Sequence, residues 1–463
     1  MIRYSLIFLL LVSIARAVDP PNVLFIAVDD MNDGITLFGE DRPFKTPNIR
    51  DLTRRGVFFS RAYCASAACN PSRAAILTGK RPHITGAYGN SADWRAAARG
   101  CLTLPEYFGR HGYSTAGFGK IYHHHRDGAF NDPASWDKFR KMDAQYMPKE
   151  KLNGATKYGS RNTDWGAWPK NSEETKTIDY KSVSYAIGVL KQDHDKPFFL
   201  ACGIFKPHSP FFAPNKYHEL YDKKISLPQR KEDDWSDLPA GAARLMGPKK
   251  WFWKGMMNLD RQKSGSYRDF IRAYAACCSF ADMSVGRLIS ALDESGHAGN
   301  TIIVLWSDHG FHLGEKDHIE KFALWEKANH VPLIIVDPRN PESAGTTCAH
   351  PVDLTTLYPT LVELCGLPAN AGNDGISVAD QVKSPSRVIG RPALMTYGFK
   401  NHAIRTSRWR YIRYADGTEE LYDHDKDPHE WTNLALDPAY AQVIREHAKW
   451  LPSTNAPPYR NLK

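Results

Sequence analysis

Two apolar segments that each lead into acidic residues constrain the fold of this chain most strongly. Residues 22–28 (NVLFIAV) form a nearly continuous apolar run and lead into Asp29-Asp30. Residues 301–306 (TIIVLW) repeat the pattern and lead into Ser307-Asp308-His309-Gly310. Such short apolar runs are typical of strands buried on both faces of a parallel sheet. Because ligand sites of open α/β sheets form at the carboxyl ends of the strands, the two segments predict an α/β protein with a polar site at that edge.

Further apolar segments extend this pattern, at residues 114–118, 197–204 and 332–336. Helical segments alternate with them; Thr103 and Glu106, for example, have the spacing of a capping box that opens a helix. Strands that alternate with helices predict a sheet that is covered by helices on its faces.

The character of the sequence changes after about residue 375. Residues 403–414 mix basic and apolar side chains, Ala415-Asp416-Gly417 is a turn signal, and residues 420–422 restart a strand pattern. This order predicts an antiparallel hairpin within a smaller C-terminal subdomain.

Two stretches lack a clear periodicity. Residues 125–180 and 215–265 are rich in Lys, Asp, Trp and Pro. We interpret both as long surface insertions near the site, since long segments without a regular pattern are commonly functional loops.

The first residues have the pattern of a secretory signal peptide. Arg3 precedes an apolar stretch at residues 6–14, and Ala15-Arg16-Ala17 supplies a small-x-small cleavage site. We therefore expect a signal peptide at 1–17 and an exported protein, either periplasmic or secreted. The apolar stretch is too short to span a bilayer, and no other segment is apolar enough to do so, so that no membrane span is expected.

Export permits disulfides, and the chain has eight cysteines. None falls into a paired CxxC zinc pattern, their pairing cannot be deduced, and Cys202 is expected to be a buried free thiol. The net charge of +9 suits an anionic partner. The Lys and Arg residues form no recognisable module for reading nucleic acid, which argues against a nucleic-acid partner.

The segment that begins at Cys69 has the pattern of a helix start. Asn70 is a good N-cap, Pro71 suits the first turn, and Gly79 suits the position just past the helix end. Cys69 is therefore expected immediately before a helix amino terminus, where free N–H groups attract anions and Arg73 adds a bidentate cation. A buried cysteine beside an ordinary capped helix is the alternative.

The sequence Cys-x-Pro-Ser-Arg at residues 69–73, followed by Leu77-Thr78-Gly79, resembles the signature of the type I sulfatase family, in which the cysteine is oxidised after translation to formylglycine. Other segments resemble family blocks in family order, so that the likeness extends from residue 22 to about residue 434. These segments are residues 22–30, 46–49, 55–59, 119–120, 206–208, 307–310, 313–315, 331–334, 357–360, 420–423 and 427–434.

The resemblance implies a fold, a domain division and a maturation partner. The expected fold is α/β and alkaline-phosphatase-like, with a large mixed sheet flanked by helices and a smaller C-terminal α+β subdomain that carries an antiparallel sheet. The expected divisions are a signal peptide at 1–17, a catalytic domain at 18–375 and the C-terminal subdomain at 376–463. The expected partner protein is a formylglycine-generating enzyme or an anaerobic maturase.

For the metal, the resemblance implies a site formed by Asp29, Asp30, Asp308, His309 and residue 69. Carboxylate oxygens are the ligands that Ca²⁺ and Mg²⁺ prefer, and the family favours Ca²⁺ over Mg²⁺. His309 occupies a position that is Asn in many sulfatases, and here the sequence is similar to the iduronate-2-sulfatase branch. A nitrogen ligand is less typical for calcium.

For catalysis, the resemblance implies that one hydroxyl of a formylglycine hydrate at residue 69 attacks sulfur, and that the other, once deprotonated, expels sulfate from the covalent sulfo-enzyme. Lys120 and Lys321 match family lysines that bind the sulfate oxygens, and His208 matches the family general acid. Of three consecutive histidines, His123 is expected to face residue 69, while His124 and His125 are expected to be solvated. His83 replaces the Asp expected in the most similar branch, which bears on substrate contacts there.

The function implied is that of an exported sulfatase that cleaves an O-sulfate ester of a sulfated sugar or polysaccharide, by exo-cleavage, with a 2-O-sulfated uronic acid as the candidate group. Two alternatives are open. One is a formylglycine-dependent phosphonate or phosphate ester hydrolase, and the other is a glycan-binding relative that has lost the chemistry.

Overall fold

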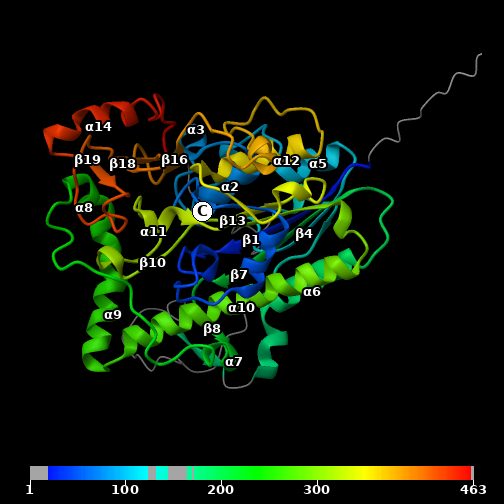
Figure 1. The fold of residues 1–463 in the computed structure, drawn as a ribbon, viewed down its shortest axis with the longest axis horizontal. Coiled ribbons are helices and arrows are strands. Elements are labelled where there is room, and N and C mark those ends of the chain that lie inside the picture. The colour runs from blue at the N-terminus through cyan, green and yellow to red at the C-terminus, as the bar shows by residue number, and fades with distance from the viewer. Residues whose placement is uncertain (1–18, 124–131, 144–163, 169–170, 460–463) are drawn as a thin grey trace, which may run out of the picture.

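The computed structural model describes residues 19–123, 132–143, 164–168 and 171–459 (Figure 1). The predicted signal peptide at 1–17 lies outside these residues, as do His124 and His125.

The described residues form a central eight-stranded sheet with the order β14-β2-β13-β9-β1-β7-β4-β5. The strands are β1 (Asn22–Asp29), β2 (Val57–Phe59), β4 (Ser114–Gly119), β5 (Lys138–Phe139), β7 (Phe198–Pro207), β9 (Thr301–Ser307), β13 (Leu333–Val336) and β14 (Thr346–Cys348). The strand β1 pairs in parallel with β7 and β9, whereas β13 runs antiparallel to β9. The sheet is therefore mixed, and each apolar segment predicted to be a strand belongs to it.

The central strand β1 is buried on both faces, as its apolar run predicts. Leu24, Ile26 and Val28 belong to one core cluster, and the alternate residues Val23 and Phe25 belong to the other. Full burial of each such large side chain contributes about 1.5–3 kcal/mol. Helices cover both faces (Figure 1), namely α6 (Ile178–Leu190) and α10 (Ser266–Glu294) on one face and α2 (Cys69–Thr78), α5 (Leu104–Arg110) and α12 (Leu357–Leu364) on the other.

Helix α10 is the core helix of the first face. Among the described residues it is the one helix long and apolar enough to cross a membrane, and 72% of its most apolar window is buried inside the protein. Its inner face includes Phe270, Tyr274 and Phe280, which are fully buried. The apolar length of α10 is thus explained by packing against the sheet.

Short elements surround the sheet. The small strands are β3 (Ala62–Tyr63), β6 (Trp165–Trp168), β8 (Phe211–Pro214), β10 (His312–Leu313), β11 (Ile319–Glu320), β12 (His330–Val331) and β15 (Val352–Asp353). The short helices are α1 (Pro47–Leu52), α3 (Pro82–Thr85), α4 (Trp94–Ala97), α11 (Glu326–Asn329) and α13 (Ala379–Lys383). The helix α5 begins with the predicted capping box between Thr103 and Glu106.

Residues 215–265, interpreted as a long surface insertion because they lack a clear periodicity, have regular structure. This stretch contains α7 (Asn215–His218), α8 (Ala240–Met246) and α9 (Trp251–Gln262). The helix α9 buries Phe252, Met256 and Leu259, whose spacing of four and three residues places them on one helix face. Of residues 125–180, the parts 125–131, 144–163 and 169–170 lie outside the described residues.

The C-terminal subdomain carries a four-stranded antiparallel sheet, as predicted. Its strands are β16 (Ala393–Thr396), β17 (His402–Arg405), β18 (Trp409–Arg413) and β19 (Glu419–Asp423), and the helix α14 (Ala441–Ala448) packs against one face. The hairpin predicted around Gly417 joins β18 to β19. Residues 403–414, interpreted as one hairpin arm, instead form two paired strands, because a turn at residues 406–408 reverses the chain.

All eight cysteines lie in the described residues, and each is a free thiol. Cys202 is fully buried in β7, as expected for a small apolar side chain in a core strand. The fold of the described residues is therefore held by packing and polar contacts.

A buried ion pair joins the helical layer to the C-terminal sheet. The Arg81 guanidinium pairs with the Asp353 carboxylate at 2.9 Å, and both side chains are almost fully buried. The carbonyl oxygen of Leu394, in β16, accepts a hydrogen bond from Arg81, and the amide of Leu394 donates one to Asp353. Three segments that are distant in sequence thus share one polar contact.

We predict that Asp353→Ala lowers the free energy of unfolding by about 3–5 kcal/mol, because it leaves the Arg81 charge buried without its partner. Urea unfolding followed by circular dichroism would measure this change. The control Asp51→Ala removes an exposed partner of Arg54 and should change the free energy by less than about 0.5 kcal/mol. Equal losses in both variants would contradict the prediction.

Candidate active site

The carboxyl ends of β1 and β9 bring two acidic segments together. Val28 lies opposite Ser307 in the parallel register, so Asp29 and Asp30 follow one strand where Asp308 follows the other. The Asp30 amide donates a hydrogen bond to the Asp308 carboxylate at 3.2 Å. Asp30 has a φ of 61°, a left-handed conformation that Asp tolerates better than most residues. The two acidic segments predicted to meet at this edge of the sheet therefore lie side by side.

Cys69 is the first residue of α2, so the helix begins two residues earlier than predicted, and the Cys69 side chain is buried. The N-cap is Ala68, without a side-chain cap, and Asn70 instead donates hydrogen bonds to the carbonyl oxygens of Gly89 and Ala92. The prediction that Asn70 caps the helix is therefore wrong. Gly79 ends the helix in the left-handed conformation, as predicted.

Arg73 connects the two acidic segments to the helix. Its guanidinium pairs with Asp308 at 2.7 Å and with Asp29 at 3.2 Å, and donates to the carbonyl oxygens of Lys120 and Ile121 at 2.6 and 3.1 Å. The side chains of Arg73, Asp29 and Asp308 are fully buried. Burial opposes charge on Arg73, but the carboxylates outweigh burial and raise its pKa. Arg73 is thus a permanent cation that holds the site together.

Two lysine ammonium groups approach the Cys69 sulfur. The Lys321 Nζ lies 3.1 Å from Sγ and 2.7 Å from Asp30, and the Lys120 Nζ lies 3.8 Å from Sγ and forms a close ion pair with Asp29. Burial opposes ionisation of Asp29, but Lys120 outweighs it and holds the pKa of Asp29 below its usual value. Both lysines predicted from the sequence therefore face residue 69.

Two imidazoles complete the surroundings of residue 69. The Nε2 of His309 lies 3.2 Å from Sγ, and His123 is close enough to the thiol to help lower its pKa. Burial opposes ionisation of Cys69, but Lys120, Lys321 and His309 outweigh it and hold the pKa of the thiol well below its usual value. This field favours negative charge at residue 69, whichever group carries it.

The donor atoms at the end of β1 fit a divalent metal ion. Four side chains each offer one ligand atom, and these atoms lie within 4.8 Å of one another; the residues are Asp29, Asp30, Cys69 and His309. Asp308, the fifth predicted ligand, lies beside this group, with its Oδ2 atom 3.5 Å from His309 Nε2 and bonded to Arg73. Carboxylate oxygens predominate in this set, which suits a hard cation.

His208 lies on the segment that follows β7. Its side chain is partly buried, and Nδ1 lies 2.7 Å from the carbonyl oxygen of Ser209. Because a carbonyl oxygen only accepts hydrogen bonds, Nδ1 must carry a proton and Nε2 is the nitrogen that can exchange one. His208 is close enough to Asp29 to favour ionisation of that carboxylate.

His83 lies against the C-terminal subdomain. Its ring lies edge to face with the ring of His402, with centroids 6.0 Å apart. Burial lowers the pKa of His83 to about 4, so the imidazole is neutral near pH 7. The change from Asp to His at this position thus removes a negative charge.

Several contacts that support the site carry no signal in the sequence, although Ser72 itself belongs to the Cys69–Arg73 motif. The Tyr274 hydroxyl donates to the Asp30 carbonyl oxygen at 2.6 Å, and the Ser72 hydroxyl donates to the Asp308 carbonyl oxygen at 2.6 Å. Asp179, at the start of α6, accepts from the amides of Phe205 and Lys206 and so positions the segment that leads to His208. These contacts join residues that are far apart in the chain, which explains why spacing alone does not reveal them.

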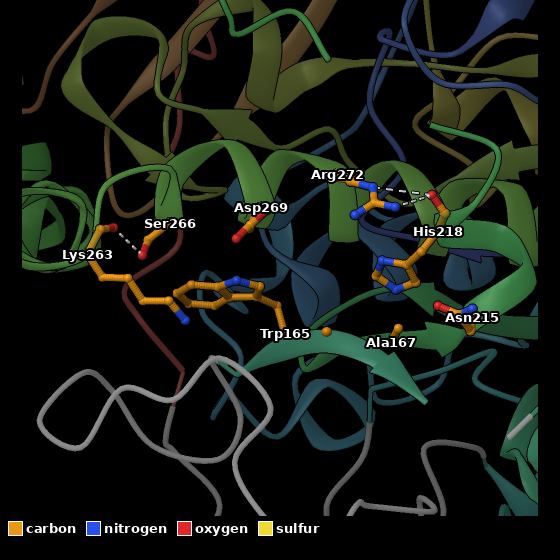
Figure 2. Close-up of a pocket in the computed structure, with 9 residues that line it drawn as sticks. Trp165, Ala167, Asn215, His218, Lys263, Ser266, Asp269 and Arg272 are labelled. Carbon is orange, nitrogen blue, oxygen red and sulfur yellow. Dashed lines mark hydrogen bonds between the residues drawn. The ribbon is translucent and has the colours of Figure 1, made fainter. Parts of the chain in front are cut away.

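Two other places in the described residues bring polar side chains together. Glu326, His424 and Glu430 also bring ligand atoms together, but Arg410 pairs with both carboxylates, and its charge opposes a metal ion. A cavity of about 210 Å³ lies between β6, α7 and the start of α10 (Figure 2). It is lined by Trp165, His218, Lys263, Asp269 and Arg272 among others, and by none of the predicted site residues.

Comparison with protein families agrees with this geometry. Residues 21–367 match the family described as Sulfatase, and residues 314–456 match the one described as N-sulphoglucosamine sulphohydrolase, C-terminal. The first match includes Cys69, both lysines and each predicted metal ligand.

Two curated relatives are similar over most of this chain. A "Sulfatase" of Formosa agariphila is 37% identical over 96% of this chain and 88% of its own length. The iduronate 2-sulfatase of Homo sapiens is 31% identical over 75% of this chain and 70% of its own length.

Solved structures share the fold. A 2-O GAG sulfatase superposes with a TM-score of 0.71 and 23% identity, covering 93% of this chain and 91% of that one. A phosphonate monoester hydrolase from Silicibacter pomeroyi superposes with a TM-score of 0.75 and 21% identity, covering 93% of this chain and 94% of that one. At these identities the likeness establishes the alkaline-phosphatase-like fold. Because a family match extends over most of the chain and a curated relative is 37% identical, the chain belongs to the sulfatase family of sulfuric ester hydrolases.

Proposed function

We propose that this protein is an exported sulfatase that hydrolyses an O-sulfate ester of a sulfated sugar, with residue 69 acting as formylglycine. The observation that carries the proposal is the convergence of Lys120, Lys321 and His309 on the side chain of residue 69. Sulfate carries negative charge, and buried cations around the attacked group stabilise it more strongly than they would in water. The signal-peptide pattern at residues 1–17 supports export.

The roles of the chain's own residues follow from their contacts. When present, formylglycine supplies the hydroxyl that attacks sulfur, and a bound Ca²⁺ supplies positive charge beside the sulfate oxygens. Asp29, Asp30, Asp308 and His309 would hold the ion. Lys120 and Lys321 bind the sulfate oxygens, and Arg73 keeps Asp29 and Asp308 in position.

His208 is proposed as the acid that protonates the departing sugar oxygen. Since Nδ1 is committed to the Ser209 carbonyl oxygen, the proton comes from Nε2 of the imidazolium form. His123 is proposed to bind the oxygen atoms at residue 69, because it is close enough to the side chain there to shift its pKa.

For the substrate, we propose a 2-O-sulfated uronic acid at the end of a saccharide chain. The similarity to iduronate 2-sulfatase supports this group, and so does the presence of His at position 309, as the sequence resemblance implies. The proposed protein partner is the enzyme that oxidises Cys69, either aerobic or anaerobic.

We predict that the protein, co-produced with a formylglycine-generating enzyme, releases sulfate from saccharides with a 2-O-sulfated uronic acid, and that Cys69→Ala releases none. Ion chromatography of sulfate over a panel of defined sulfated saccharides is the measurement, with mass spectrometry to verify the aldehyde at residue 69. Hydrolysis of phosphonate or phosphate diesters without sulfate release would contradict the proposal and identify the protein as a phosphonate or phosphate ester hydrolase. Unchanged glycan binding without any hydrolysis by matured protein would identify a binding relative.

We predict that Lys321→Ala lowers kcat by about 10²–10³, because it removes a preorganised cation from the reacting group. The Lys45→Ala variant is the matched control, since that ammonium contacts the Leu220 carbonyl oxygen at the surface. Steady-state kinetics on the sulfated substrate measures kcat for both variants and for the wild-type protein. A kcat for Lys321→Ala within twofold of wild type would remove Lys321 from the mechanism.

We predict that removal of divalent ions by a chelator abolishes sulfate release and that Ca²⁺ restores it better than Mg²⁺. If Ca²⁺ binds the folded protein and not the unfolded chain, it should also raise the free energy of unfolding by about 2.7 kcal/mol at a Ca²⁺ concentration 100 times the Kd. Thermal unfolding with and without Ca²⁺ measures this without reference to activity. Asp30→Asn should lose the stabilisation, whereas the surface variant Asp51→Ala should keep it.

A further inference from the structure

Lys321 lies in the segment of residues 316–326, whose backbone has unusual conformations. Eight non-glycine residues of the described chain have positive φ values, and four of them, Lys316, Asp317, Glu320 and Phe322, lie within residues 316–322. Their φ values are 53°, 49°, 144° and 71°. Such conformations are unfavourable for residues with a Cβ and persist only where the surrounding structure holds them. The position of the Lys321 ammonium therefore depends on contacts outside the segment.

The C-terminal subdomain holds the end of the segment that follows Lys321. The guanidinium of Arg410, in β18, is fully buried and donates to the Leu324 carbonyl oxygen at 2.8 Å. It also forms a close ion pair with Glu326. The neighbouring Trp325 donates its indole N–H to Glu420, in β19, at 2.8 Å.

The same subdomain holds the end that precedes Lys321. The Lys316 ammonium is bonded to the Glu430 carbonyl oxygen and lies 3.2 Å from Asp234. The Glu430 carboxylate in turn accepts from the Glu326 amide at 2.9 Å and pairs with Arg410 at 2.7 Å. Arg410 and Glu430 thus link both ends of residues 316–326.

The middle of the segment is anchored to the active site. The Phe322 amide donates to the carbonyl oxygen of Ala67, two residues before Cys69, at 2.9 Å. His318 is bonded to the Lys321 carbonyl oxygen at 2.6 Å. With both ends held by the subdomain and the centre held at Ala67, the Lys321 side chain has little freedom to leave Cys69 and Asp30.

We propose that Arg410 is a positioning residue for catalysis, which acts through residues 316–326 on the Lys321 ammonium. The C-terminal subdomain is thereby part of the catalytic apparatus, although Arg410 touches no reacting atom. This inference rests on the proposed function in one respect, namely that Lys321 acts on the sulfate group. The physical coupling between Arg410 and Lys321 does not depend on the proposed function.

Tyr411 provides a matched control on the same strand. It is the neighbour of Arg410 in β18, and because side chains alternate across a sheet, it points to the opposite face. There it packs with Ile404 and Leu421 under α14, away from residues 316–326. Tyr411→Leu therefore perturbs the subdomain core without touching the segment.

The experiment is a kinetic double-mutant cycle on the full-length, matured protein. Arg410→Met should lower kcat by about 10–100-fold with KM within about twofold of wild type, because a small misplacement of a catalytic group has effects of that size. In a protein that already carries Lys321→Ala, adding Arg410→Met should alter kcat less than about twofold, because Arg410 acts on catalysis only through the Lys321 ammonium. Arg410→Lys should recover part of kcat, and Tyr411→Leu should leave kcat unchanged at a temperature where each variant is folded.

Amide hydrogen exchange provides a readout without turnover. Arg410→Met should accelerate exchange at Phe322 and Glu326, and Tyr411→Leu should not. If Arg410→Met does not fold, Trp325→Phe, which removes the bond to Glu420 and part of a buried ring, should show a smaller change in the same direction in both measurements.

Equal effects of Arg410→Met and Tyr411→Leu on kcat, or additive effects of Arg410→Met and Lys321→Ala, would overturn the proposal. If wild-type protein releases no sulfate from any substrate, the proposed function fails, and the exchange at Phe322 and Glu326 alone decides whether Arg410 positions the segment.

Discussion

The buried Arg73 guanidinium is the interaction on which the rest of the structure depends. It joins helix α2 to the ends of β1 and β9 through Asp29 and Asp308, and it also binds the carbonyl oxygen of Lys120 after β4. Four separate segments of the chain thereby meet at one cation. A buried ion pair that lost one partner would leave an uncompensated charge at large cost, so these segments keep their relative positions. Cys69, at the start of α2, is placed by the same contacts.

Positive charge dominates the space around residue 69. The side chains of Lys120, Lys321 and His309 approach the Sγ atom. Carboxylate oxygens of Asp29 and Asp30 lie within 4.8 Å of the same atom. The cations favour an anion at residue 69, and the carboxylates suit a hard cation beside it. The C-terminal subdomain completes the arrangement, because its residues hold the segment that carries Lys321.

Much of the fold and of the candidate site could be predicted from local patterns. The apolar runs at residues 22–28 and 301–306 identify strands buried on both faces, and the acidic residues after them identify the edge where the site forms. Other features could not be predicted. Asn70 has the chemistry of an N-cap, yet its side-chain amide donates to the carbonyl oxygens of Gly89 and Ala92, which no local pattern indicates.

The sequence by itself determined which elements form, where the polar edge of the sheet lies, and which chemical groups are available there. It did so because strand burial, helix ends and the Cys69–Arg73 motif depend on residues within one or two turns. Only the tertiary structure decided that Arg73 lies between two carboxylates, that Tyr274 and Ser72 support the acidic segments, and that Arg410 reaches residues 316–326. These contacts join residues dozens to hundreds of positions apart, and their geometry arises only when the packed sheet and helices bring those positions together.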